Sequence, residues 1–232
     1  MSETLRWSRW NFAVAFALLF VAADAAADPG QADKDPRNDA IVAPPDAIPD
    51  CTDRLTKAGI DFAPTRLPVK ERNGFACGAP DVVVYRGSAA KIRWSPQPIV
   101  TCSMALALAR FEAVAQEEAE RNFGKRIVRI EQGGTYSCRK MARFKMVSEH
   151  SYANAIDVRA FLLQNGRRIT VERDFGALKA EPTTPVGVFM RTVPRRAYDA
   201  GLFSVVLTRF FDELHRDHFH LDMARYRIDG TR

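Results

Sequence analysis

Polar and apolar residues alternate in the segment HFHLD near the end of the chain. Successive side chains of a β-strand point to opposite faces of the sheet, so this alternation predicts a strand with one apolar and one polar face. Phe219 and Leu221 would enter the core, whereas His218, His220 and Asp222 would share the other face. The pattern therefore predicts a strand that presents two imidazoles and a carboxylate in one row.

A second strand is predicted at residues 155–163, where Asp157 points away from the face of its apolar neighbours. If this strand lies beside the C-terminal one in the sheet, Asp157 and His220 can converge on a single ion. His150 precedes the strand in the loop that enters it, so it can fold back over the same face.

The rest of the chain mixes strands with helices. Further strands are predicted at residues 81–86, 127–132 and 167–174, and helices at a short segment after Asp50, at 101–121 and within 187–211. Asp50 and Thr101 are candidate N-caps, because their side-chain oxygens can accept a backbone N–H, and Gly59 can end the first helix. Asn165-Gly166 between two strands is a strong hairpin signal. These features predict an α+β fold: a single domain with a small antiparallel sheet carrying the metal site, flanked by helices.

The N-terminal residues have the pattern of a secretory signal peptide. Arg6 and Arg9 precede an apolar run and an Ala-rich stretch, with cleavage expected after Ala25 or Ala27. The apolar run is shorter than the roughly 20 residues that span a bilayer, so we expect no stable membrane span and a periplasmic location. The predicted organisation is a signal peptide at 1–27, a flexible linker rich in Pro, Asp and Ala at 28–49, and a folded domain at 50–232.

Composition and charge narrow the classes of partner. The chain has 232 residues, of which 47% are hydrophobic, enough for a sizeable core. Its formal net charge of +6 fits a solvated surface or attraction to a polyanion such as nucleic acid, anionic lipid or a cell-wall polymer. No block of Lys and Arg is interleaved with aromatic residues, so nucleic acid is not an expected partner.

Four cysteines, none in Cys-x-x-Cys spacing, agree with an oxidising compartment and argue against a redox motif or a zinc ribbon. Three disulfide connectivities are possible. Pairing Cys51 with Cys77 and Cys102 with Cys138 would tie neighbouring segments, and this is the connectivity we favour, although the sequence alone does not determine it.

All four histidines fall in two motifs, SEHSYANAID and LHRDHFHLD, which suggests that they act together. Two imidazoles and one carboxylate leave a coordination position open, as in catalytic zinc sites. The same donors also match the facial triad of non-haem iron oxygenases. Because those oxygenases usually need an organic co-substrate, which is scarce outside the cell, we expect Zn²⁺.

With His150, Asp157 and His220 as ligands, a water molecule would take the fourth position and become a nucleophile near neutral pH. His218 lies two residues from a ligand on the same face, so it is the expected general acid and base. His215 can reach the same site if the chain bends after it.

Two acidic residues of the second motif leave alternatives open. Asp222 either orients an imidazole from behind or is an ordinary exposed carboxylate on a strand. Asp217 is either a rival general base or a turn residue where the strand begins.

The motifs SxH-x6-D and HxHxD resemble the zinc motifs of peptidoglycan peptidases, namely the D-Ala-D-Ala metallopeptidases and murein endopeptidases. The resemblance implies that His150, Asp157 and His220 bind zinc and that His218 holds the catalytic position. The His-x-x-His-x-His spacing that begins at His215 is particularly similar to the murein endopeptidase branch.

A longer series of motifs resembles the extensin-like C-terminal domain family of exported bacterial proteins. The series runs from about Cys51 to Asp222 and includes Cys77-Gly78, Cys102, GTYSCR at 134–139 and the two histidine motifs. The resemblance implies that Arg139 is an invariant arginine near the site, where it holds a substrate carboxylate or carbonyl, or else forms a plain surface salt bridge. In the first case we expect Arg139 and Zn²⁺ to stabilise the tetrahedral oxyanion together. Relatives often carry two further cysteines, near Tyr198 and Asp229, which this chain lacks.

Together these features predict a zinc-dependent peptidoglycan amide hydrolase, an endopeptidase or carboxypeptidase acting on stem peptides. The alternative is a non-catalytic cell-wall binding module that zinc only stabilises. An iron oxygenase is a third, less favoured reading of the same donors.

Overall fold

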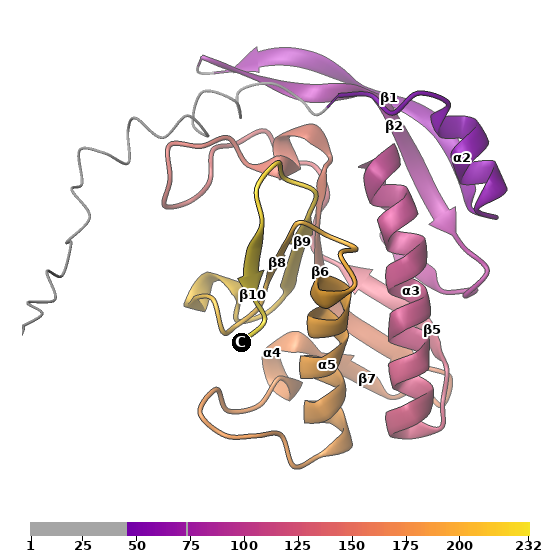
Figure 1. Ribbon diagram of the computed structural model, residues 1–232, viewed down its shortest axis with the longest axis vertical. Helices are drawn as coiled ribbons and strands as arrows, with labels where there is room; N and C mark the ends of the chain where they lie inside the picture. Colours follow the sequence, from indigo (N-terminus) through magenta and orange to yellow (C-terminus); the bar gives the residue numbers. More distant parts are fainter. Residues whose placement is uncertain (1–45, 73) are drawn as a thin grey trace, which may run out of the picture. The chain divides into compact units, whose positions relative to one another are not determined.

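The strands form two separate sheets in the computed structural model, which describes residues 46–72 and 74–232 (Figure 1). The smaller sheet is antiparallel and has the order β1-β2-β4. Its strands are β1 (Asp61–Arg72), β2 (Phe75–Gly87) and β4 (Ile99–Thr101).

The larger sheet carries at its centre the two predicted strands that hold Asp157 and His220. Its order is β10-β8-β9-β6-β5-β3, with β7 also paired to β6. The strands are β3 (Arg93–Ser95), β5 (Ile127–Gln132), β6 (Ala155–Leu163), β7 (Arg168–Thr170), β8 (Val205–Leu207), β9 (Phe219–Asp222) and β10 (Ile228–Gly230). The central pairs are antiparallel, whereas the outer pairs β10–β8 and β3–β5 are parallel.

Two long helices lie side by side (Figure 1). The helices are α2 (Cys51–Lys57), α3 (Cys102–Phe123), α4 (Val171–Asp174) and α5 (Pro185–Asp199), with 3₁₀ turns η2 (Glu149–Tyr152) and η3 (Glu213–His215). Phe111 of α3 and Phe189 of α5 are fully buried, and Phe189 meets Phe161 of β6 edge to face. The apolar faces of both helices therefore share one core with the larger sheet.

The predicted α+β class is confirmed, and several elements match their expected bounds. Strands β5 and β6 begin and end where the alternation placed them. Thr101 caps α3 by accepting the N–H of Met104. Gly166 has a positive φ of 83° in the turn between β6 and β7, as the Asn-Gly pair predicts.

Other expectations were wrong. Only the first half of 167–174 is a strand, because the Thr170 side chain accepts the N–H of Arg173 and starts α4. Asp50 precedes α2 but makes no side-chain cap hydrogen bond, since its backbone is left-handed with φ 56°. β1 was not predicted: it is a largely exposed strand whose one partner among the described strands is β2, so it lacks an alternating apolar face.

The favoured disulfide connectivity was also wrong. The bonds are Cys51–Cys102 and Cys77–Cys138. The start of α2 lies against the start of α3, which brings Cys51 to Cys102. Cys77 instead lies near the far end of the β1–β2 hairpin, where it joins the loop before η2. Sequence proximity misled here because β1 and β2 carry the chain away from α2.

The described residues, 46–72 and 74–232, belong to one compact unit. The predicted signal peptide and the linker up to residue 45 lie outside the described residues. Among the helices that are described, none is long and apolar enough to cross a membrane.

Candidate metal centre

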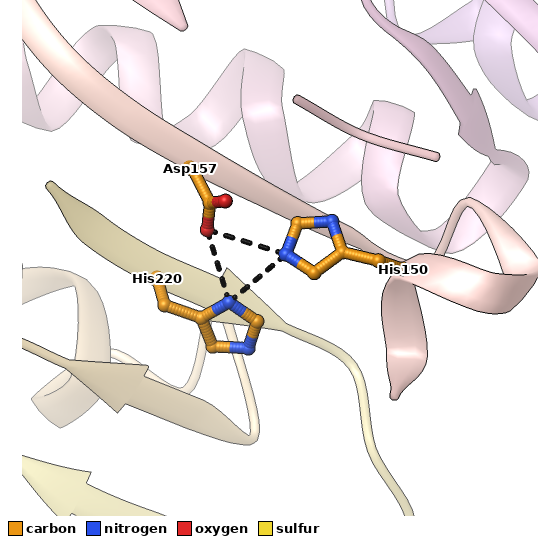
Figure 2. Close-up of side chains that lie close together, drawn as sticks. All are labelled: His150, Asp157 and His220. Atoms are coloured by element: carbon orange, nitrogen blue, oxygen red, sulfur yellow. Dashed lines mark hydrogen bonds and ion pairs between the residues drawn. The ribbon is translucent and has the colours of Figure 1, made fainter. Parts of the chain in front are cut away.

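Strand register brings two of the three predicted ligands together. Strands β6 and β9 are antiparallel neighbours, and Asp157 is directly paired with His220. His150 comes from η2, which ends just before β6 begins, and its ring turns back toward both residues (Figure 2). The Ser148 hydroxyl caps η2 by accepting the N–H of His150. The expected convergence of these three side chains is therefore confirmed.

The donor atoms form a nearly equilateral triangle (Figure 2). Asp157 Oδ1 lies 3.2 Å from His150 Nε2 and 3.1 Å from His220 Nδ1, and the two nitrogens are 3.2 Å apart. A tetrahedral zinc ion with bonds of about 2.0–2.1 Å requires ligand atoms about 3.3 Å apart. The donor set and its spacing therefore fit Zn²⁺ with one coordination position open.

Asp222 lies on the side of His220 away from Asp157. Its position distinguishes between the two roles considered for it, orienting an imidazole or being an exposed carboxylate on a strand. Its Oδ2 is 2.8 Å from His220 Nε2, and its exposed fraction is only 1%. A carboxylate that accepts the Nε2 proton directs the Nδ1 lone pair toward the triangle and raises its basicity. Asp222 thus orients the imidazole of His220 and is not an exposed strand carboxylate.

The charges at the triangle support one another. Burial alone would raise the pKa of Asp157, but its hydrogen bonds to His150 and His220 hold that pKa well below its usual value. Burial alone would lower the pKa of His220, but hydrogen bonds to Asp157 and Asp222 raise it to about 10. Both ring nitrogens of His220 therefore carry a proton in the metal-free protein near neutral pH. Metal binding must displace the proton on Nδ1.

A second buried carboxylate beside the site was not found by sequence reasoning. Glu149 is 6% exposed, and burial, followed by the charge of Asp222, raises its pKa to about 7. Asn154 donates to Glu149 Oε2 at 2.6 Å and also to the carbonyl of Met223 after β9. The only sequence signal for Glu149 was its place next to His150 in the SEH motif.

His218 lies at the edge of the triangle. Its Nε2 is 3.5 Å from Asp157 Oδ1, and its Nδ1 is 2.9 Å from Asp217 Oδ1. Arg159 approaches the second oxygen of Asp217 at 3.7 Å. Asp217 therefore anchors the ring of His218 and is not a free general base, while Nε2 of His218 faces the ligands.

His215 is held in the same way by an acid that the sequence did not single out. Its Nδ1 is 2.6 Å from Asp212 Oδ1, and Arg143 approaches Asp212 Oδ2 at 3.5 Å. The ring centre of His215 lies 5.2 Å from that of His218 and 5.9 Å from that of His220. Burial lowers the pKa of His215 despite its hydrogen bond to Asp212. All four histidines are thus gathered at one place.

Arg139 reaches the site through its backbone. Its N–H is bonded to the Ser151 hydroxyl, and its carbonyl accepts the N–H of Ser148, so it is tied to the turn that carries His150. The exposed guanidinium lines a surface hollow near Phe75. The structure therefore does not bring the Arg139 side chain onto the ligand triangle.

Comparison with known protein families identifies the family of this chain. The family model described as Extensin-like protein C-terminus matches residues 49–231. No curated protein and no solved structure gives a significant match.

Proposed function

The chain belongs to the extensin-like protein C-terminus family, and from this membership and the site geometry we propose that it is a zinc-dependent amide hydrolase of peptidoglycan. The bonds cut would be those of the stem peptides, and the place of action would be the periplasm. The likeness of its two histidine motifs to those of D-Ala-D-Ala metallopeptidases and murein endopeptidases supports this substrate class, and the export-type N-terminal sequence supports the compartment.

One observation carries the proposal: three donor atoms, two nitrogens and one oxygen, lie 3.1–3.2 Å apart beside a fourth side chain that can transfer a proton. A structural zinc site would use four protein ligands, whereas an open position serves catalysis. Zn²⁺ held there would supply a Lewis acid that polarises a carbonyl and lowers the pKa of water to about 7.

The residues around the triangle divide the remaining work. Asp222 holds His220 in the tautomer whose Nδ1 faces the ligands. His218, fixed through Nδ1 by Asp217, would use Nε2 to take a proton from the attacking water and deliver it to the leaving amine. His215, fixed through Nδ1 by Asp212, lies next to His218 and would use Nε2 to accept a hydrogen bond from the attacking water.

The test is incubation of the zinc-loaded protein with purified muropeptides and analysis of the products by mass spectrometry. We expect new amine and carboxylate termini, lost when a chelator is present and restored by added Zn²⁺. His218→Ala should lower turnover by about 10²–10⁴-fold while zinc content stays at one ion per chain, because His218 transfers protons and is not needed as a ligand.

His220→Ala is the matched variant: it should lose both turnover and zinc. Uncut muropeptides from folded, zinc-loaded protein would contradict the hydrolase. If such protein still sediments with sacculi, the non-catalytic wall-binding module replaces it.

A further inference from the structure

An open hollow on the surface is lined by three cations. Arg72 at the end of β1 and Arg139 and Lys140 in the loop before η2 surround Phe75 and Cys138. All three cationic side chains are exposed, and none forms an ion pair with any residue in 46–72 or 74–232. Three neighbouring cations without an acidic partner repel one another, and a bound anion would relieve that repulsion.

The walls of this cationic hollow are held in place by covalent and hydrogen bonds. Cys77–Cys138 joins the hairpin to the loop, and Phe75, which is 5% exposed, packs with Cys77 in a small buried cluster. Lys140 lies with Nζ 5.9 Å from the ring centre of Phe75, and its backbone bridges to Val147. The cations are therefore presented by a fixed frame and not by three independent loops.

The same frame is continuous with the candidate metal centre. Ser151 of η2 bonds the N–H and the carbonyl of Arg139, and the N–H of Ser137 donates to the carbonyl of His150. A chain-like ligand bound at the cationic hollow would therefore be held at a fixed offset from the residues that carry His150. Such an offset suits a polymer that has charged groups along its length.

We propose that the cationic hollow binds carboxylate groups of a peptidoglycan stem peptide, at a site separate from the metal ligands. This inference rests on the proposed function for the identity of the polymer, but it concerns binding and not cleavage. Guanidinium groups offer paired donors that match a carboxylate, and Lys140 adds a third charge, so a segment with at least two acidic groups fits better than a single one. Strand alternation turns Glu71, the nearest acid in sequence, to the opposite face of β1 from Arg72.

The experiment measures binding of the chelator-treated protein, which cannot turn over a metal-dependent reaction, to purified sacculi by co-sedimentation. The variant Arg72→Gln/Lys140→Gln removes two charges from the cationic hollow. The matched control Arg110→Gln/Lys125→Gln removes two exposed charges from α3 and from the segment just after it. We expect the first variant to bind about tenfold more weakly and the control to stay within about twofold of the unmodified protein, since each lost contact is worth somewhat under a tenfold change.

Two further arms identify the bound group. Sacculi whose carboxyl groups have been converted to amides should bind the unmodified protein about as weakly as untreated sacculi bind Arg72→Gln/Lys140→Gln. Tricarballylate should compete with untreated sacculi more strongly than inorganic phosphate does. Equal losses for both double variants would overturn the proposal, because net charge alone would then explain binding. Full binding to amidated sacculi would overturn it as well.

Folding and catalysis are separated from binding by two controls. Both double variants should unfold at the same temperature as the unmodified protein. Lys140→Glu alone is a second variant of the cationic hollow, for which we expect a stronger loss of sacculus binding than for Arg72→Gln/Lys140→Gln. If the zinc-loaded protein does not cleave muropeptides but binds sacculi, only the proposed hydrolase activity is contradicted. If the protein cleaves muropeptides but the two double variants bind sacculi equally well, only the proposed binding at the cationic hollow is contradicted.

Discussion

At the scale of single residues, His220 is the most constrained side chain of the site. Its two ring nitrogens face two different carboxylates, Asp157 in the ligand triangle and Asp222 behind it. The first contact would be exchanged for a metal bond, whereas the second would persist. The ligand quality of His220 is therefore set by Asp222, a residue that need not touch the ion.

Replacing Asp222 with Asn tests this dependence. The amide has the same shape but no charge, so His220 becomes a weaker donor, and we expect zinc affinity to fall by about 10–100-fold. Competition against a chromophoric chelator measures the change. Asp217→Asn is the control, because Asp217 bonds His218 and no proposed ligand; an equal loss of affinity in both variants would contradict the assigned role of Asp222.

Glu149 gives a pH prediction with a defined sign. Its pKa is raised from 4.5 to about 7, so between these pH values the folded protein holds a proton that the unfolded chain has already released. The free energy of unfolding must therefore fall as pH rises through this window. Glu149→Gln removes the titration, so we expect the variant to gain up to about 3 kcal/mol relative to the unmodified protein between about pH 4.5 and pH 8.

Urea unfolding of both metal-free proteins across that range measures the difference, in which the other titrating groups cancel. The amide introduced by Glu149→Gln can still accept the hydrogen bond of Asn154, so packing is preserved. A stability difference that does not vary with pH would contradict the raised pKa of Glu149.

At the scale of elements, the candidate site depends on how strands pair and how a loop is tied down. The alternation in 155–163 and 218–222 was sufficient to predict which side chains share a face, because that depends only on the period of a strand. That the two strands are neighbours was a condition the sequence did not supply. It follows from the sheet order, in which β9 inserts between β8 and β6.

The remaining misses have the same physical origin. The acids Asp212 and Glu149 lie in 3₁₀ turns or beside them, where no periodicity marks the direction of a side chain. The disulfide partners depend on where α2 and the β1–β2 hairpin pack, which local sequence does not specify. Local patterns thus predicted the ligands, and tertiary packing was needed for the residues that hold them.

The two disulfides should have different effects on the candidate metal centre. Cys77→Ser/Cys138→Ser releases the loop whose backbone is bonded to η2, so we expect both lower stability, by about 2–4 kcal/mol, and weaker zinc binding. Cys51→Ser/Cys102→Ser releases α2 from α3 and should cost similar stability without weakening zinc binding.

Chemical denaturation and chelator competition on the two double variants measure these two quantities. If zinc affinity falls equally in both variants, the link between the Cys77–Cys138 loop and His150 is contradicted.

At the scale of the whole molecule, a bound ion would join segments that are far apart in sequence. The candidate ligands come from η2, β6 and β9, and β9 lies near the centre of the larger sheet. The donors of the unfolded chain are separated by up to 70 residues. Metal would therefore bind the folded state far better than the unfolded one and stabilise it.

We accordingly expect Zn²⁺ at about a hundredfold excess over its dissociation constant to raise the unfolding temperature by about 5–10 °C. Differential scanning calorimetry with and without chelator measures the shift. His220→Ala should show no shift under the same conditions, and a shift of equal size in that variant would place the stabilising ion elsewhere.

The pairing of Asp157 with His220 has a consequence for insertions and deletions. Sliding β9 by one residue along β6 would set Phe219 or Leu221 opposite Asp157 and turn the imidazoles of His218 and His220 toward the core, which would remove His220 from the candidate site. Sliding it by two residues keeps the faces and offers Asp157 a new partner, His218 in one direction. An insertion or deletion that shifts β9 by one residue should therefore abolish the candidate site. A shift by two residues in one direction would still place an imidazole, that of His218, opposite Asp157.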